Sequence, residues 1–412
     1  MTYSSGGLIQ ATDYKGFVST TVGANVNATW GTGVTSAGYG QTAIATVGTT
    51  GTTGAIASVT LATAGVLTVS SGTYFVGQEI TVTGSFSAGS ISGYTTGTRY
   101  YIIAVGGATS ITISATPSGS AVTSTAGTAT PGATFTITGS ASIVTATQWA
   151  TLVNTIASMG SHQGTTITAR TAPVAGNTIS ILSAVNTDIT NCYNNRGNAA
   201  ASGSQFTGYT GTNSKTGTTT GATWSITFTN TVTFASADAA RYFFNAGGTI
   251  KIDVSKTSTG ALGDPEWNDL ATTLCGDIFI TGGAYSQTIA GVVYTGTTKS
   301  GGTGTPNTLA TTTGFFDLTP GGAAVIVYKQ FADTAPYTNN FIQHSLSLDA
   351  GSTVLTITTL WSASDGDPIT GGTAASGATP GTAPCTIVTY FPPSTTYLTA
   401  AWGTPSVAAT TA

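Results

Sequence analysis

The chain has 412 residues, of which 40% are hydrophobic and only 6% are charged, and its formal net charge is -4 at pH 7. Ordinary soluble domains have about 25% charged residues, so this chain depends on hydroxyl, amide and backbone groups for its contact with water. Its ten lysines and arginines are scattered, which argues against a nucleic-acid partner because phosphates require clustered cations. No apolar run approaches the roughly 18 residues of a membrane span, so we expect no membrane insertion.

The first 45 residues are rich in glycine and threonine and show little periodicity. We predict an extended N-terminal segment over residues 1–45, in which Tyr14, Phe17 and Trp30 are anchors that become ordered against a partner. The opening residues, MTYSSGGLIQATDYKG, have neither a basic region nor an apolar core. They therefore do not resemble a secretory signal peptide.

Residues 46–145 contain short apolar alternations separated by turn residues. In EITVTG, Ile80 and Val82 fall on one face and the threonines on the other, which is the period of a half-buried strand. Five further runs have the same character: SVTLAT, GVLTVSS, RYYIIAVG, SITISAT and ATFTITG. Six short strands in this space predict a small antiparallel β-sandwich or barrel module.

Helical spacing appears next, in VTATQWATLVNTIASMGSHQ. Apolar residues from Trp149 to Met159 recur on one face, Thr147 is placed to cap the start, and Gly160 is placed to stop the helix. We predict a helix over 147–159.

A second stretch of the same kind, GNTISILSAVNTDITNCYNNRGN, predicts a helix over 178–195 that stops before Gly197. The two helices together define a two-helix segment over 146–196. Threonine and asparagine are poor helix formers, so packing must hold both helices.

Strand signals return in the last 216 residues, 197–412. In TWSITFTNTVTFAS, Trp224, Ile226 and Phe228 alternate, and Val232 and Phe234 are expected to continue after a turn. The series continues through TIKIDVS, GDIFITGG, AGVVYTGT, TGFFDLT, AAVIVYKQ, NFIQHSLSLD, STVLTITTLW and CTIVTYF. These runs predict a larger antiparallel β-domain over 197–412, so the fold class of the whole chain is mainly β.

The stretch TFASADAARYFFNAGGTI lies between two of these strands and is expected to form one or two helical turns. Ser236 is a suitable cap, and Asp238 and Arg241 are three residues apart in the first turns. The aromatic run Tyr242, Phe243 and Phe244 is interpreted as a helical plug at one end of the β-domain. A ligand site made of aromatics and arginine stays open as the alternative. The packing or interface candidates of the chain are Arg241, Tyr242, Phe243, Phe244, Trp149 and Trp224.

The side chains of acid-base and metal chemistry are sparse. Cys192, Cys275 and Cys385 are odd in number and widely spaced, so they are interpreted as buried small hydrophobes. His162 and His344 have no catalytic motif around them and are expected to be surface or structural residues. We predict no cofactor and no catalytic residues.

Two acidic loops leave alternatives open. GDPEWND holds Asp264, Glu266 and Asp269, and SASDGDP holds Asp365 and Asp367. We interpret them as solvated turn acids, with calcium ligation and glycoside cleavage as the two alternatives. Neither loop matches a complete calcium-binding motif.

Several stretches resemble virion structural proteins of tailed phages that infect cyanobacteria or other aquatic bacteria. YFVGQEITVTGSFSAGSISGYTTGTRYYIIAVGGATSITIS is similar to a small β-module of such proteins. The later block from VTATQWATLVNTIASMGSHQGTTIT through VTFASADAARYFFNAGGTIKI, with IAGVVYTGTTKSGGTGTP and YTNNFIQHSLSLD, is similar to the same class. The resemblance covers about two thirds of the chain. It implies a neck, collar, tail-fibre or appendage component, made in the host cytoplasm and assembled into the virion with other virion proteins. Residues 1–45 then become a candidate particle-docking segment.

Three functions follow as hypotheses. The first is a non-enzymatic homo-oligomer, expected to be a trimer, because winding identical chains together covers exposed strand edges. The second is a secreted or surface adhesin that binds carbohydrate. A host surface glycan is also a candidate partner of the virion protein in the first hypothesis. The third is a capsular polysaccharide depolymerase, for which Glu266 with Asp269 or Asp264 is the nominated acid pair.

Overall fold

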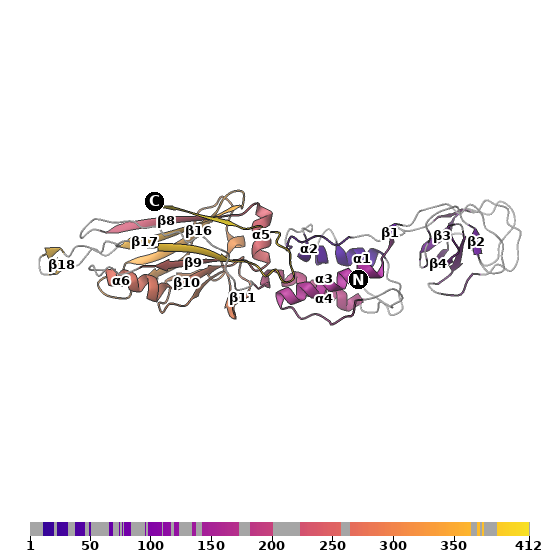
Figure 1. Ribbon diagram of the computed structural model, residues 1–412, viewed down its shortest axis with the longest axis horizontal. Coiled ribbons are helices and arrows are strands. Elements are labelled where there is room, and N and C mark those ends of the chain that lie inside the picture. Colours follow the sequence, from indigo (N-terminus) through magenta and orange to yellow (C-terminus); the bar gives the residue numbers. More distant parts are fainter. Residues whose placement is uncertain are drawn as a thin grey trace. The chain divides into compact units, whose positions relative to one another are not determined.

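The computed structural model describes the helices and strands of the chain that Figure 1 draws as ribbons and arrows. The described residues are 11–19, 23–31, 38–45, 49–50, 66–68, short runs between 74 and 122, 134–136, 142–172, 182–200, 223–256, 264–363, 369–370, 373–374 and 385–411. The fold is mainly β with antiparallel sheets, as predicted. The predicted strand at SVTLAT, residues 58–63, lies outside the described residues.

The chain forms two compact units whose boundaries differ from the four predicted segments. The first unit contains Met1–Thr20, Ile44–Asn154 and Ala169–Thr187, and the second contains Thr21–Ala43, Thr155–Thr168 and Asp188–Ala412. The predicted N-terminal segment and the predicted two-helix segment are therefore each divided between the two units.

A five-stranded antiparallel sheet with the order β2-β5-β4-β3-β6 forms the β part of the first unit. Its strands are β2 (Val66–Thr68), β3 (Glu79–Thr83), β4 (Arg99–Val105), β5 (Ser110–Ser114) and β6 (Thr134–Thr136). Ile80, Ile102 and Ile113 are almost completely buried, as the period-two pattern predicts. A separate two-stranded ladder joins β1 (Thr49–Thr50) to β7 (Ser142–Ile143).

The N-terminal segment is not extended throughout, because helix α1 (Ala11–Val18) forms in it. Tyr14 and Phe17 of α1 pack edge-on against Trp149, with ring centroids 5.5 and 6.1 Å away. All three side chains are buried. Two of the three predicted anchors, Tyr14 and Phe17, therefore pack within the first unit rather than against a partner, and burial of their rings holds a helix whose own propensity is low. The third, Trp30, ends helix α2 (Val26–Trp30) in the second unit and is half-buried.

Helix α3 (Ala146–Gln163) contains the predicted helix but differs from it at both ends. Thr145, rather than Thr147, is the cap: its hydroxyl accepts a hydrogen bond from the Gln148 amide, and its own amide donates to the Gln148 side chain. This reciprocal pair is a capping box. Gly160 does not stop the helix; a Cβ at this position would lie 2.9 Å from the Ile167 side chain. The stop is Gly164, whose φ of +67° is readily adopted by glycine.

The second predicted helix is α4 (Leu182–Asn194), followed by a short 3-10 turn, η1 (Arg196–Asn198). Residues 178–181, where the helix was expected to begin, lie outside the described part of the chain. The carbonyl of Cys192 in α4 accepts a hydrogen bond from the Gln163 side chain at the end of α3.

A second helix, α2 (Val26–Trp30), also lies in the segment that we predicted to be extended. The Asn25 side chain caps it by accepting from the Ala28 amide at 2.8 Å. Farther along, the Gln41 carboxamide forms a double link to Thr399: its nitrogen donates to the Thr399 carbonyl and its oxygen accepts from the Thr399 amide. These contacts make residues 23–31 and 38–45 part of folded structure.

Two larger antiparallel sheets build the second unit, with the orders β13-β10-β9-β20 and β14-β15-β16-β17-β8-β21. The four-stranded sheet contains β9 (Thr249–Ser255), β10 (Asp277–Ile280), β13 (Thr297–Ser300) and β20 (Cys385–Phe391). The six-stranded sheet contains β8 (Trp224–Thr233), β14 (Thr308–Leu309), β15 (Val325–Phe331), β16 (Phe341–Leu348), β17 (Val354–Ala363) and β21 (Ser406–Thr411). Two small ladders join β11 (Gln287–Ile289) to β12 (Val292–Tyr294) and β18 (Ile369–Thr370) to β19 (Thr373–Ala374).

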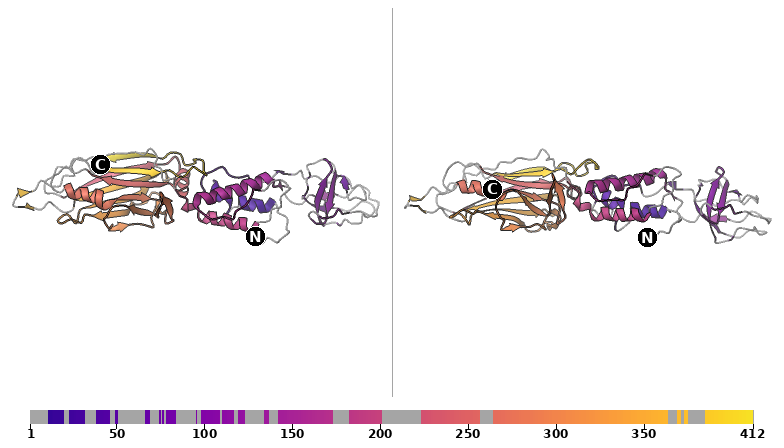
Figure 2. Two further views of the ribbon diagram at one scale, coloured as in Figure 1. Left: turned by 60° about the horizontal axis from the view of Figure 1, so that its bottom comes forward. Right: turned by 90° about the horizontal axis from the view of Figure 1, so that it is seen from below.

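Helix α5 (Ala237–Asn245) lies at one end of these sheets (Figures 1 and 2). Ser236 caps it as predicted, accepting from the Ala239 amide at 3.0 Å. Phe243 packs against Phe234, which follows β8, and against Tyr390 of β20, so this one side chain contacts both sheets.

Three local predictions in this unit are wrong. First, β8 runs without a turn through Asn230, which is buried in the middle of the strand. Second, TGFFDLT forms a 3-10 turn, η3 (Phe315–Asp317), because the Asp317 carboxylate accepts from the Gly314 amide and closes a tight turn. Third, GDPEWND is helical rather than a turn: α6 (Asp264–Asn268) continues into a π-helical segment, η2 (Asp269–Cys275).

Candidate binding groove

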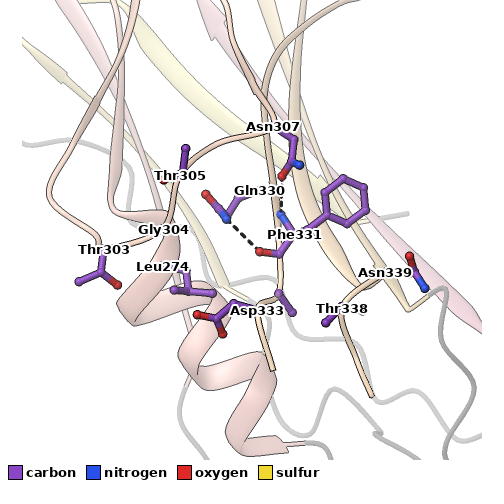
Figure 3. Close-up of a pocket in the computed structure, with 11 residues that line it drawn as sticks. Leu274, Thr303, Gly304, Thr305, Asn307, Gln330, Phe331, Asp333, Thr338 and Asn339 are labelled. Atoms are coloured by element: carbon purple, nitrogen blue, oxygen red, sulfur yellow. Dashed lines mark hydrogen bonds between the residues drawn. The ribbon is translucent and has the colours of Figure 1, made fainter. Parts of the chain in front are cut away.

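An open groove lies where the loop between β13 and β14 meets the connection from β15 to β16 (Figure 3). Its volume is about 820 Å³. One wall is Thr303–Thr305 with Asn307, the other is Gln330–Asp333 with Thr338 and Asn339, and Leu274 of η2 completes the lining. Most of these side chains carry a hydroxyl, a carboxamide or a carboxylate. The groove is thus lined largely by neutral hydrogen-bonding groups.

Backbone hydrogen bonds fix the β13–β14 wall to the end of η2. The amide of Thr303 donates to the Thr273 carbonyl at 2.8 Å, and the amide of Gly304 donates to the Leu274 carbonyl at 3.2 Å. The Lys299 ammonium donates to the Gly304 carbonyl. The loop is therefore held from both sides, which pre-organises this wall.

Asn307 connects the two walls. Its amide donates to the Lys329 carbonyl at 2.8 Å, and its side-chain oxygen accepts from the Phe331 amide at 3.3 Å (Figure 3). Lys329 itself is not a lining residue; its ammonium lies over the rings of Phe331 and Phe341, at 4.5 and 3.7 Å from their centroids. No lysine or arginine lines the groove among the residues that the structure describes there.

Gln330 is the most enclosed polar side chain of the groove, with 4% of its surface exposed. Its nitrogen donates to the Phe331 carbonyl at 2.9 Å, and its oxygen, Oε1, is buried without a hydrogen-bond partner (Figure 3). A carbonyl oxygen can only accept a hydrogen bond, so the carboxamide atom next to it must be the nitrogen. This bond therefore distinguishes the nitrogen from the oxygen of the Gln330 carboxamide. The Gln330 carboxamide also packs flat on Gly304, where a Cβ would lie 2.9 Å from its three terminal atoms.

The predicted acidic residues do not form a described site. Glu266 lies in α6 and Asp269 begins η2, whereas the side chain of Asp264 and all of Asp365 and Asp367 lie outside what the structure describes. Within the described residues, no cluster of three or more histidine, cysteine or acidic side chains could hold a metal ion. The described residues therefore provide no arrangement of acidic side chains that supports calcium binding or glycoside cleavage.

Both histidines are buried, which removes the surface alternative for them. The Nδ1 atom of His344 lies 3.0 Å from the Thr359 hydroxyl. His162 packs edge-on against Tyr39, with 5.2 Å between ring centroids. Burial lowers the pKa of His344 to about 3 and that of His162 to about 4, because a charged imidazole loses its hydration there. Both rings are therefore neutral at pH 7.

The cysteines Cys192 and Cys275 are free thiols in buried positions. Burial raises the pKa of the Cys192 thiol to about 11 and that of Cys275 to about 12. Neither thiol is a nucleophile at neutral pH. The side chain of Cys385 lies outside the described part of the chain.

The aromatic run of α5 is core rather than ligand site. Tyr242, Phe243 and Phe244 are all buried, and Phe244 stacks on Phe315 with 4.5 Å between ring centroids. Arg241 pairs with Asp238 at 2.5 Å on the surface. None of the three aromatic side chains is exposed for contact with a ligand or a partner. Of the remaining packing candidates, Trp149 is buried in the first unit, and the side chain of Trp224 in β8 is not among those described.

Sequence reasoning missed the groove because its walls come from three separated parts of the chain. Gln330 is the last residue of the predicted strand AAVIVYKQ, and its position fits the ordinary alternation of that strand. Nothing local distinguishes it from Gln343 on the neighbouring strand.

No protein-family model, curated protein or solved structure matches this chain. Among the described residues, no helix is both long enough and apolar enough to cross a membrane. The fold and the groove define a mainly β protein with an open groove that is polar and largely uncharged.

Proposed function

We propose that this protein is a non-enzymatic structural subunit of a tailed-phage virion, which self-associates as a trimer in a neck or tail appendage. The observation that carries the proposal is a pair of uncharged strands, β20 and β21, each of which ends its sheet among the described strands. It adds to the resemblance of the sequence to phage structural proteins. In the same proposal, the five-stranded sheet belongs to a small β-sandwich or barrel, and the two larger sheets form a larger sandwich.

The two larger sheets differ sharply in their edges. On one side, the edge strands β13 and β14 are linked, since the Thr297 amide donates to the Ala310 carbonyl at 3.2 Å. On the other side, β20 and β21 each pair with only one neighbour among the described strands. Strand β21 bonds to β8 and β20 bonds to β9. Among the described residues, this second side therefore presents two rows of backbone donors and acceptors.

Monomeric proteins usually protect such edges with lysine, proline or an inward-pointing charge. Here both edge strands lack charge and proline, and no charged residue occurs anywhere in the chain after Asp367. A protein built to stay monomeric would be at risk of uncontrolled pairing at these strands. Pairing with identical chains would satisfy the backbone donors and acceptors of these strands, and little charge would have to be desolvated.

Light scattering of the full chain at micromolar concentration tests the oligomer. We expect a mass three times the 40.8 kDa of one chain. Ala408→Lys places a charge at an exposed position of β21 and should lower the mass to that of one chain. Ala350→Lys, an exposed position in the turn between β16 and β17, is the matched control and should stay trimeric. A wild-type chain that is monomeric would contradict the proposal.

Peptide mass spectrometry on density-purified particles tests the virion assignment. The protein should be enriched at a fixed ratio to other virion proteins, compared with the soluble fraction of the same lysate. Its absence from particles would favour the alternative of a carbohydrate-binding surface adhesin. Cleavage of host polysaccharide that Glu266→Gln abolishes would favour the depolymerase alternative.

A further inference from the structure

We propose that the groove around Gln330 is a binding site for a neutral saccharide, formed by Thr303–Thr305, Asn307, Gln330, Asp333, Thr338 and Asn339. This inference does not rest on the virion assignment, because the groove belongs to the second unit by itself. It names the chemistry of the ligand that the groove would take.

Gln330 provides the first argument. A buried oxygen without a hydrogen-bond partner is destabilising unless a ligand or solvent group donates to it. Because the Gln330 nitrogen is committed to the Phe331 carbonyl, rotation of the carboxamide cannot relieve this cost. Oε1 is thus a fixed acceptor, and the group that satisfies it must be a donor such as a hydroxyl.

The charge of the lining selects the ligand class. Its one charged side chain is the carboxylate of Asp333, which repels phosphate, sulfate and carboxylate groups. The nearby cations are engaged elsewhere: Lys299 donates to the Gly304 carbonyl, and Lys329 lies over two aromatic rings. A neutral ligand is therefore favoured over an anionic one.

The polarity and openness of the groove separate a saccharide from other neutral ligands. Pockets for apolar small molecules are mostly enclosed and lined by hydrophobic side chains. Here hydroxyls and carboxamides dominate, and each can both donate and accept. A saccharide presents hydroxyl groups that also do both. An open groove additionally admits an internal part of a long chain, which an enclosed pocket would exclude.

A peptide fits the groove less well. Peptides are commonly recognised by pairing with a strand edge or by apolar side-chain pockets. Strand β15 is not an edge, since it pairs with β14 and β16 on its two sides. The apolar part of the lining is limited to Leu274, Phe331 and Ala332.

Binding of the full-length protein to an array of neutral and anionic oligosaccharides is the test. We expect at least one neutral oligosaccharide to bind, with an affinity that changes less than about twofold between low and high salt, since no ion pair is involved. Gln330→Met removes the acceptor at nearly constant volume and should weaken binding at least tenfold. Gln343→Met, a glutamine on the neighbouring strand outside the groove, should leave binding unchanged.

A second pair of variants guards against loss of folding. Thr338 is exposed at the groove, so Thr338→Arg should block it without disturbing the core, whereas Thr319→Arg substitutes an exposed threonine that is not a lining residue. Equal thermal midpoints of the two variants, with binding lost only in Thr338→Arg, would support the site. The inference is overturned if no neutral oligosaccharide binds, if Thr338→Arg binds as well as wild type, or if the groove variants affect only anionic glycans or peptides. These outcomes leave the particle measurement unaffected, so the two proposals can fail separately.

Discussion

The imidazole of His344 stacks on the phenol ring of Tyr328, with 5.3 Å between the ring centroids and 20° between the planes. The Tyr328 hydroxyl donates to the Cys275 carbonyl at 3.1 Å. This stack ties strands β15 and β16 to the end of η2, from which Leu274 enters the groove. A neutral imidazole fits this core position, whereas a protonated one would bring an uncompensated charge into it.

Stability should therefore fall as the pH drops below about 6.5. The pKa values of His344 and His162 are lowered in the folded protein to about 3 and about 4, so between these values and 6.5 the unfolded chain binds more protons. Each histidine should reduce the free energy of unfolding by about 2 kcal/mol between pH 6.5 and about pH 5. Urea unfolding at a series of pH values measures this slope.

The matched variant for the pH series is His162→Gln combined with His344→Gln. It should be less stable overall but should lose most of the slope between pH 6.5 and 4. Asp349 acts in a separate window: hydrogen bonds from Val354 and Thr353 lower its pKa, so its contribution is lost only at pH values below about 4. An unchanged slope in the double variant would show that other groups cause it.

Truncation of Phe243 should be among the most costly changes in α5. The ring is fully buried, contacts both sheets, and packs on Gly248, where a Cβ would lie 2.4 Å from the ring. We expect Phe243→Ala to lower the free energy of unfolding by about 3–5 kcal/mol. Phe316→Ala is the control, because Phe316 is 40% exposed and should cost about 1 kcal/mol. Similar costs for the two variants in urea titrations would refute the assignment of Phe243 as the link between the sheets.

Loss of the Gln41 side chain should release Thr399 locally. The Gln41 oxygen accepts from both the amide and the hydroxyl of Thr399, at 2.7 and 2.6 Å. In Gln41→Ala, hydrogen exchange of the Thr399 amide should accelerate at least tenfold, and stability should fall by about 1–3 kcal/mol. Gln343→Ala should do neither, since its hydrogen bond to Ser345 is 3.4 Å long and partly exposed. Unaltered exchange at Thr399 would mean that other contacts hold this segment.

Cys192 and Cys275 should resist alkylation in the folded protein. For Cys192, raising the pKa from 9.0 to about 11 reduces the thiolate population about 100-fold, and burial reduces access further. Peptide mass spectrometry after iodoacetamide treatment at pH 8 should find both residues unmodified in the native protein and modified in urea. Rapid labelling of either one in the native state would contradict its buried position.

The strands and the aromatic helix were the most predictable parts of the chain, because their signals are local. The alternation in EITVTG and the Ser236 cap each lie within a few residues, and both are found as expected. The helix at 264–275 was missed although Pro265 stands at its first turn, where proline is favoured. We interpreted Asp-Pro as a turn, and glycine at 160 as a stop, when the first begins a helix and the second allows a close contact with Ile167.

The groove and the division into two units were not predictable from such signals. The lining brings Leu274, Thr303 and Gln330 together across more than fifty residues of sequence. Likewise, the Tyr39 hydroxyl reaches the carbonyl of Arg196, far along the chain. The periodicity of a short stretch of sequence carries no information about which other stretch it will contact, so only the folded structure identifies these contacts.

The paired hydrogen bonds between Gln41 and Thr399 join residues that are 358 positions apart. During synthesis on the ribosome, Gln41 emerges long before its partner exists, and at about 5–20 residues per second this wait lasts roughly 20–70 s. The Gln41 carboxamide is therefore without this partner until nearly all of the second unit has been translated. Because only 6% of its residues are charged, the chain can form few premature ion pairs during that interval.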